Sequence, residues 1–193
     1  MSSYLEKGGN QVARGSIYEV ANTRGEKAAS LLARADVIVM LDISSSMRGE
    51  KHHKACQALE DIQKTFPGRV ALIEFNDYAQ LNLRGIPNIP SGMTMMHLAL
   101  EMGRTFDGTD TRFYLISDGA PNGCAHDDLL QIAASFTNPI HTVFIGNDWD
   151  TNGQKTLEDI SSATGGTSAG RIEPKMLGKT LMGLLTGGQD DGE

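Results

Sequence analysis

The chain has 193 residues, a length that suits one domain with a full hydrophobic core and leaves little room for a second. Hydrophobic residues make up 39% of it and charged residues 21%, and no apolar run approaches the ~20 residues that a membrane-spanning helix needs, so we expect no membrane segment. The formal net charge is −7 and the Lys and Arg residues are scattered, which argues against a general nucleic-acid-binding protein, because such proteins need a clustered basic surface.

Two further features bear on where the protein works. Residues 1–7 contain no apolar core of the kind that secretory signal peptides have, so we expect an intracellular, cytoplasmic protein. Cys56 and Cys124 lie far apart in the sequence and match no zinc or redox spacing, which predicts two free thiols and no disulfide.

The pattern divides the chain into three segments. In residues 1–34 the glycines at positions 8, 9 and 15 interrupt any periodicity and only residues 26–32 indicate a short helix, so this N-terminal arm has no definite predicted structure. Residues 35–186 form the predicted domain. Residues 187–193 are rich in glycine and acidic residues and predict a disordered acidic tail.

Strand and helix patterns alternate within the predicted domain. Short apolar runs without polar alternation predict strands that are covered on both faces, at residues 37–43, 69–75, 113–117 and 140–146. Apolar residues at steps of three and four predict helices at residues 50–66, 94–106, 127–136, 154–163 and 174–185. Two weaker strands are predicted at residues 79–83 and 167–172, and the first alternates polar and apolar residues as an edge strand does.

Strands separated by helices in this order predict an α/β fold. The sheet is expected to be doubly wound, Rossmann-like and mostly parallel, with one antiparallel edge strand and helices on both faces. In such sheets ligands bind at the loops that follow the carboxyl ends of the strands. The residues of those loops are therefore the first candidates for a functional site.

The first predicted strand ends abruptly at a polar stretch, Asp42-Ile43-Ser44-Ser45-Ser46. One interpretation is that these side chains cap the following helix, because Ser and Asp are favoured N-cap residues. However, two other loops bring oxygen-bearing side chains to the same predicted edge of the sheet. The combined set contains hard oxygen ligands without His or Cys, which suits Mg²⁺, with Mn²⁺ and Ca²⁺ as further candidates, and not zinc. Its members are Asp42, Ser44, Ser46, Thr94 and Asp118.

Three motifs in this order resemble the von Willebrand factor A family, in particular its members with a metal-ion-dependent adhesion site. In that family an Asp-x-Ser-x-Ser motif follows the first strand, a Thr lies in the second loop, and an Asp, often within Ser/Thr-Asp-Gly, follows the fourth strand. The matching residues here are Asp42-Ile43-Ser44-Ser45-Ser46, Thr94 and Ser117-Asp118-Gly119, and the resemblance extends over residues 35–185. One departure is Met93, which follows Gly92 where many family members have Gly immediately before the Thr.

The resemblance implies a role for each of these residues and for the domain. Ser44, Ser46 and Thr94 would reach the metal directly or nearly so, and Asp42 and Asp118 would hold it directly or through water. The resemblance implies a non-catalytic protein-binding module, because a carboxylate of a partner protein would fill an open position on the metal. The expected partner is a protein that presents Asp or Glu, and intracellular members of the family often work in larger assemblies, including assemblies with AAA-type ATPases.

Two other functions fit parts of the pattern. In one, Asp42 is the nucleophile of a metal-dependent phosphohydrolase, but haloacid-dehalogenase-like enzymes carry a second Asp two residues later as general acid, where this chain has Ser44. The sequence also lacks the Gly-x-Ser-x-Gly and Gly-x-x-x-x-Gly-Lys motifs. In the other, the domain is a metal-free scaffold subunit of an assembly. Against this alternative, the sequence has a suitable residue at all five ligand positions.

Several residues near the predicted site are candidates for its rim. Met93, Met95 and Met96, next to Thr94, are equally consistent with an adaptable contact surface and with core packing. Asn76 and Asp77 follow the second predicted strand, and residues 148–150, with the sequence Asp-Trp-Asp, follow the strand at 140–146.

Overall fold

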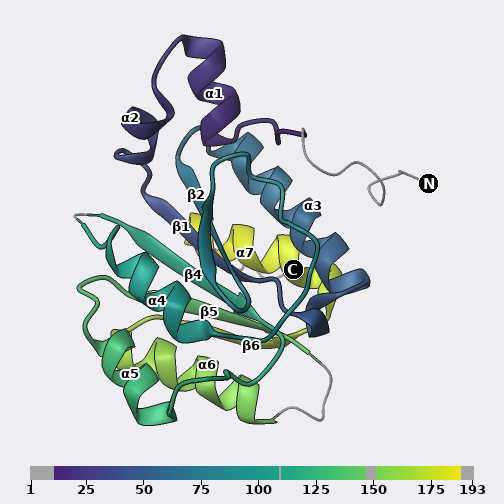
Figure 1. Cartoon of the computed structure of the whole chain (residues 1–193), viewed down its shortest axis with the longest axis vertical. Coiled ribbons are helices and arrows are strands. Elements are labelled where there is room, and N and C mark those ends of the chain that lie inside the picture. Colours follow the sequence, from purple (N-terminus) through teal and green to yellow (C-terminus); the bar gives the residue numbers. More distant parts are fainter. Residues whose placement is uncertain (1–10, 109, 147–150, 188–193) are drawn as a thin grey trace, which may run out of the picture.

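Every residue of β1 (Val37–Asp42) is buried, as expected of a strand that helices cover on both faces. The computed structural model describes residues 11–108, 110–146 and 151–187, and these residues form a six-stranded sheet with β1 near its middle. The other strands are β2 (Val70–Phe75), β3 (Ala79–Asn82), β4 (Arg112–Ser117), β5 (Ile140–Ile145) and β6 (Ser168–Ile172). Their spatial order is β3-β2-β1-β4-β5-β6 (Figure 1).

Neighbouring strands pair in parallel, except that β3 runs antiparallel to β2 at one edge of the sheet. This arrangement confirms the predicted doubly wound, mostly parallel sheet with one antiparallel edge strand. All six residues of β2 are buried and all four of β3 are half-buried, which is why the sequence of β3 alternates and that of β2 does not.

Helices cover both faces of the sheet (Figure 1). The helices α3 (Glu50–Thr65) and α7 (Leu177–Thr186) pack together on one face. The other face is covered by α4 (Met96–Arg104), α5 (His126–Ala134) and α6 (Thr151–Thr164). Single turns of 3-10 helix, η1 (Ser45–Met47) and η2 (Pro174–Met176), precede α3 and α7.

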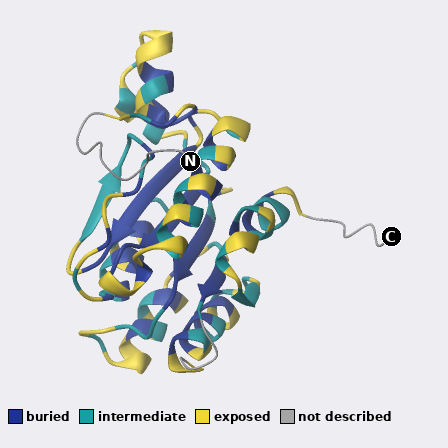
Figure 2. Cartoon of the chain, turned by 90° about the vertical axis from the view of Figure 1, so that its right-hand side faces the viewer, coloured by how far each residue is buried: buried dark blue, intermediate teal, exposed yellow. Residues whose placement is uncertain are grey.

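The side chains of β1 alternate between the hydrophobic cores on the two faces of the sheet. Ile38 and Met40 pack with residues of α4, α5 and α6, whereas Val39 and Leu41 pack with residues of α3 and α7. Figure 2 shows the resulting arrangement, in which buried strands lie between helices whose outer sides are exposed. Because β1 has no polar face, Asp42 is its first polar residue, and it comes where the strand ends.

The N-terminal arm contains a helix that the sequence pattern does not predict. α1 (Ile17–Arg24) begins directly after Gly15, which we interpreted as a break, and Ser16, whose hydroxyl accepts a hydrogen bond from the backbone amide of Glu19 at 3.2 Å. Ile17 and Val20 of this helix are buried in the core on the α4 side of the sheet. α2 (Ala28–Leu32) lies within the helix predicted at residues 26–32.

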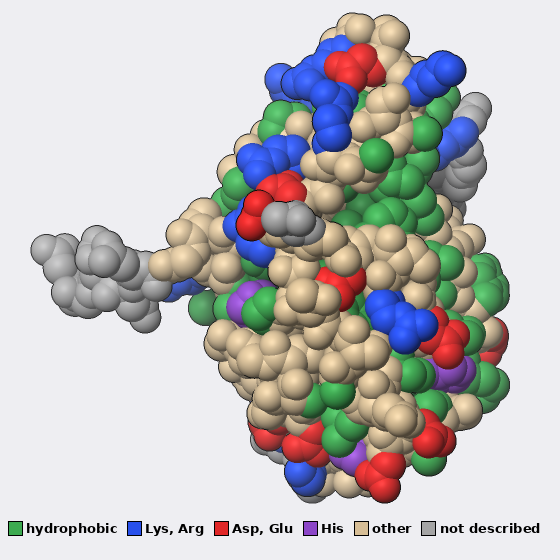
Figure 3. Space-filling model, turned by 90° about the vertical axis from the view of Figure 1, so that its left-hand side faces the viewer, with side chains coloured by type: hydrophobic (Ala, Val, Ile, Leu, Met, Phe, Trp, Pro, Cys, Tyr) green, Lys and Arg blue, Asp and Glu red, His purple; other side chains and the backbone are tan. Residues whose placement is uncertain are grey.

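Charged side chains are unevenly distributed on the surface. On the face in Figure 3, Lys and Arg gather at the end of the molecule that carries α1 and α2. The exposed basic residues of this segment are Arg14, Arg24, Lys27 and Arg34. This end lies away from the carboxyl ends of the parallel strands, so the basic residues do not contribute to the predicted site.

The remaining sequence predictions concern the cysteines and the membrane. Cys56 and Cys124 are free thiols, as predicted, and burial raises the pKa of Cys56 to about 12, so it is not a reactive thiolate at neutral pH. Within the described residues, no helix combines the length and the apolar character needed to cross a bilayer. The acidic tail at residues 188–193 lies outside the described part of the chain.

We expect Ile17→Ala to lower the free energy of unfolding by about 2–5 kcal/mol, because it removes a side chain that α1 places in the core. Asn22→Ala, on the exposed side of the same helix, should change it by less than about 0.5 kcal/mol. Urea unfolding followed by circular dichroism measures both. Equal stabilities for the two variants would mean that α1 does not pack on the domain in solution.

Candidate metal centre

Asp42 lies at the carboxyl end of β1 and is fully buried. Its Oδ1 accepts a hydrogen bond from the Ser44 amide at 2.7 Å, and its Oδ2 accepts one from the Ser117 hydroxyl, at the end of β4, at 2.6 Å. Burial raises the pKa of Asp42 to about 6, an effect that the hydrogen bonds from Ser117 and Ser44 oppose and the negative charge of Asp118 reinforces. The two hydrogen bonds therefore fix the carboxylate in place, and its raised pKa means that its negative charge is poorly compensated.

Two serine hydroxyls connect the loop after β1 to Asp118. The Ser46 hydroxyl donates to Asp118 Oδ1 at 2.7 Å and lies 3.0 Å from the Ser44 hydroxyl. Because the single hydrogen of the Ser46 hydroxyl is used by Asp118, Ser44 is the donor in the contact between the two hydroxyls. Four of the five predicted ligands thus form one cluster, in which Asp118 is also buried.

The interpretation of these residues as helix caps is wrong. α3 begins after Gly49, several residues beyond the Asp-x-Ser-x-Ser stretch, and no side chain caps its first turn by a hydrogen bond. The oxygens of Asp42, Ser44 and Ser46 are instead directed into the cluster with Asp118.

Thr94, the fifth predicted ligand, lies on the adjoining loop and is buried. Its amide donates to Asn122 Oδ1 at 3.0 Å and its carbonyl accepts from the Asn122 amide at 2.8 Å. Asn122, in the loop after β4, thus holds Thr94 by the backbone groups of Thr94. The Ser45 amide donates to the Gly92 carbonyl at 3.0 Å, which ties the same loop to the one after β1. Within the described residues, no hydrogen bond joins the Thr94 side chain to the other four ligands.

A buried carboxylate, Glu74, anchors the segment that leads to Thr94. Glu74 is the fifth residue of β2 and accepts hydrogen bonds from Gln80, from Asn82 and from both the amide and the side chain of Asn88, at 2.6–3.0 Å. These bonds join β2, β3 and the loop before Thr94. The loop is thus held to Glu74 by the two hydrogen bonds from Asn88, and hydrogen bonds to a carboxylate are stronger than those between neutral groups.

Two glycines allow the loops of the site to approach other backbone and side chains closely. Gly92 has φ +76°, and a Cβ at this position would lie 2.1 Å from Asp77 Oδ2. A Cβ at Gly153 of α6 would lie 2.6 Å from the carbonyl carbon of Gly119. α6 therefore packs directly against the turn that follows Asp118.

The structure adds Lys51 to the cluster, a residue that sequence reasoning missed. Lys51 lies in the first turn of α3, forms an ion pair with Asp118 Oδ2 and places its Nζ 3.4 Å from the Ser46 carbonyl oxygen. A signal was available in the sequence, because the positive end of the helix dipole disfavours Lys in a first turn. Ser117 and Asn122 were also missed as partners of Asp42 and Thr94, although Ser117 stands in one of the motifs.

The rim of the site contains exposed apolar side chains. Met93 is 50% exposed, whereas Met96 is buried in the core, so the methionines divide between the two roles considered for them. Tyr78 and Ile89, on neighbouring loops, are 54% and 77% exposed. Asp77 Oδ1 accepts from the Met93 amide at 3.0 Å, which joins these loops. The rim candidates at residues 148–150 lie outside the described part of the chain.

The donor atoms fit a hard divalent cation. Within the described residues there is no group of three or more His, Cys, Asp or Glu side chains that could hold a metal by themselves, so a metal at this edge would depend on hydroxyl ligands as well. Two carboxylates and three hydroxyls are oxygen donors of the kind that Mg²⁺ accepts together with water. A bound cation would also stabilise the ionised form of Asp42, which burial destabilises.

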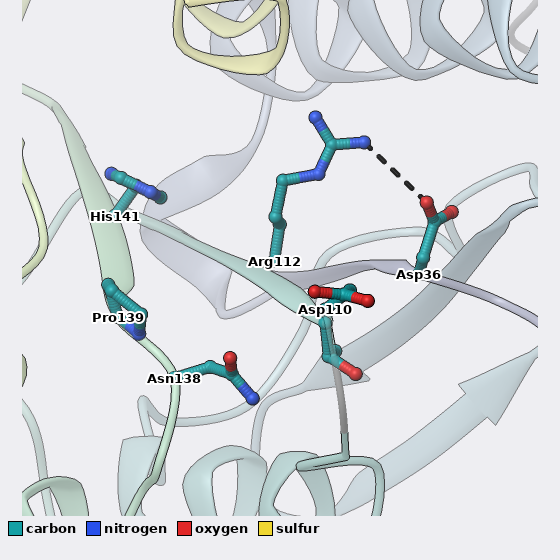
Figure 4. Close-up of a pocket in the computed structure, with 7 residues that line it drawn as sticks. Asp36, Asp110, Arg112, Asn138, Pro139 and His141 are labelled. Carbon is teal, nitrogen blue, oxygen red and sulfur yellow. Dashed lines mark ion pairs between the residues drawn. The ribbon is translucent and has the colours of Figure 1, made fainter.

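A concavity lies at the opposite, amino edge of the sheet (Figure 4). It has a volume of about 420 Å³ and is lined by residues that include Asp36, Arg112, Asn138 and His141. Its polar groups are already engaged by the protein: Arg112 pairs with Asp36 at 3.7 Å and donates to the Leu185 carbonyl at 2.8 Å, and His141 Nδ1 accepts from the Thr167 amide. We therefore do not consider it the functional site.

The raised pKa of Asp42 predicts how stability depends on pH when no metal is added. The folded protein binds this proton up to about pH 6 and the unfolded chain releases it near pH 4, so stability falls as the pH rises from 4 to 7, by up to about 3 kcal/mol from this group. Urea unfolding in EDTA at several pH values, with wild type and Asp42→Asn, isolates the effect. Identical pH profiles for the two proteins would contradict it.

Comparisons with known proteins address the fold. A scan against protein-family models finds no match, and a search of curated proteins finds none. Among solved structures, the chain is similar to VWA2, an ArnB paralog from Sulfolobus acidocaldarius, with TM-score 0.57 and 20% identity over 77% of this chain and 44% of that chain. It is also similar to a von Willebrand factor type A protein from Catenulispora acidiphila, with TM-score 0.57 and 20% identity over 76% of this chain and 41% of that chain.

A third similar structure is an aerotolerance-related membrane protein from Bacteroides fragilis, with TM-score 0.56 and 13% identity over 80% of this chain and 100% of that chain. The chain thus spans less than half the length of the first two proteins and the full length of the third. Together with the sheet order and the helical layers, these similarities establish that the chain has a von Willebrand factor A-like fold.

Proposed function

We propose that the chain is a protein-binding module that holds Mg²⁺ and uses it to recognise an acidic residue of a partner protein. The proposed ligands are Asp42, Ser44, Ser46, Thr94 and Asp118. This proposal rests on one cluster, in which the Ser44 and Ser46 hydroxyls connect the loop after Asp42 to Asp118, and both carboxylates are buried. Neighbouring buried carboxylates repel each other, and a divalent cation bound between them would offset both charges.

The same ligands would accept Mn²⁺ or Ca²⁺, because all three ions prefer oxygen donors. The two carboxylates would formally balance the charge of the ion, but because neutral hydroxyls supply the other protein ligands, the ion would remain a strong electrophile. A carboxylate from another molecule would then be a favourable additional ligand, and binding would require no covalent chemistry.

The apolar rim formed by Tyr78, Ile89 and Met93 favours a protein partner over a small anion. These three side chains are exposed beside the loop of Thr94, and a partner that presents Asp or Glu to the metal would bury them. In keeping with the family resemblance, we propose that the module acts in the cytoplasm within a larger assembly, such as one built around an AAA-type ATPase.

The geometry disfavours Asp42 as the nucleophile of a phosphohydrolase. Its side chain is fully buried, which leaves no path for a bulky phosphate ester to reach its oxygens. The alternative of a metal-free scaffold has one observation in its favour, because Lys51 partly neutralises the cluster through Asp118. Metal titration separates this alternative from the proposed function.

We expect calorimetric titration of the wild type with MgCl₂ to show one binding site, and Asp42→Ala to abolish binding while the domain stays folded by circular dichroism. Asp61→Ala, which removes an exposed carboxylate on α3, is the matched control and should bind Mg²⁺ like the wild type. Unchanged metal affinity in a folded Asp42→Ala protein would rule out the proposed site.

Recognition of a carboxylate is tested with blocked tripeptides, Gly-Asp-Gly and Gly-Asn-Gly, added to ¹⁵N-labelled protein. In the presence of Mg²⁺, the Asp peptide should shift amide resonances of residues 44–46, 94 and 118, and the Asn peptide should not, because the neutral amide is a weaker ligand for the ion. The shifts should disappear in EDTA. Equal shifts with both peptides, or shifts that persist in EDTA, would contradict recognition through the metal.

A further inference from the structure

Lys51 brings a positive charge to the cluster of proposed metal ligands. Its ammonium pairs with Asp118 Oδ2, while Ser46 donates to Asp118 Oδ1, so the same carboxylate holds both the lysine and the chain of hydroxyls. The Asp118 side chain has no exposure and that of Lys51 is 24% exposed. Within the described residues, no other Lys or Arg forms an ion pair with Asp42 or Asp118.

The position of Lys51 on α3 is unfavourable for the helix alone. The first turn of an α-helix carries unsatisfied amide groups and the positive end of the dipole, which attract carboxylates and repel ammonium groups. Lys51 is nevertheless directed toward the carboxyl edge of the sheet, where Asp118 and the Ser46 carbonyl oxygen lie. The attraction of the buried carboxylate accounts for this orientation.

A lysine bound to Asp118 and a divalent cation bound to the same carboxylate would repel each other strongly, because little water separates charges at a buried group. We propose that Lys51 acts as a tethered cation that competes with the metal, so that it weakens metal binding and leaves Asp118 when the metal binds. This inference rests on the proposed function. It adds that metal affinity is set by a residue outside the three motifs.

The competition has a consequence for the partner. When the metal displaces Lys51, its ammonium moves from a buried carboxylate toward the surface beside the site. A positive charge is then added to the face on which the partner's carboxylate docks, which favours an acidic partner in the metal-bound state only.

The test is calorimetric titration of wild type, Lys51→Met and Lys54→Met with MgCl₂. Lys54 lies on the same helix and its Nζ donates to Gln57 Oε1 at 3.1 Å, so Lys54→Met removes an equal charge away from the cluster. We expect Lys51→Met to bind Mg²⁺ about tenfold more tightly than the wild type and Lys54→Met to stay within about twofold of it. Lys51→Arg, which keeps the charge, should bind Mg²⁺ no more tightly than the wild type.

A second measurement uses the wild type and does not depend on whether a variant folds. The ¹³Cε resonance of Lys51 should shift as MgCl₂ is added, because its ammonium leaves Asp118, and the resonance of Lys54 should not.

The outcomes separate the two proposals. Equal Mg²⁺ affinity in wild type and Lys51→Met, with an unshifted Lys51 resonance, would overturn the competition and leave the metal site standing. Absence of binding in both proteins up to millimolar Mg²⁺ would overturn the proposed function and the competition with it. Binding by Lys51→Met but not by the wild type would support competition strong enough to exclude the metal.

Discussion

A carboxylate at the end of a fully buried strand must be satisfied by the protein itself, and the carboxyl edge of this sheet is arranged around that requirement. Asp42 obtains one hydrogen bond from the loop that follows β1 and another from Ser117 at the end of β4. The bond to Ser117 fixes the residue immediately before Asp118. The second carboxylate of the cluster is therefore positioned as a direct result of how the first one is buried.

Much of the fold could be predicted because the burial of a strand determines its pattern of apolar and polar residues. β1 and β2 are buried along their whole length, so they are apolar throughout, and β3 alternates because it lies at the edge. α1 escaped prediction because Gly15 and Ser16 are compatible with both a break and a helix start. Which of the two occurs depends on the core that Ile17 and Val20 enter, and no local pattern contains that information.

The candidate site shows the same division between local and long-range information. The five proposed ligands were found because each stands at the end of a predicted strand or in an adjoining loop, and parallel strands bring such positions to one edge. The structure joins four of them by direct contacts and places Thr94 on a loop tied to theirs. Lys51 and Asn122 belong to none of the motifs, so their contacts with Asp118 and Thr94 could not be predicted in the same way.

The close approach of α6 to the turn after Asp118, through Gly153, has a consequence for the cost of binding. α6 packs against the turn after Asp118, Glu74 holds the loop before Thr94, and Asn122 joins the two loops. These loops are therefore already ordered before any ligand binds. Ordering a flexible loop would subtract from the affinity, and here little ordering is left to do. The loops of this edge are preorganised, so differences in affinity between ligands would reflect contacts with side chains and hardly any rearrangement of the backbone.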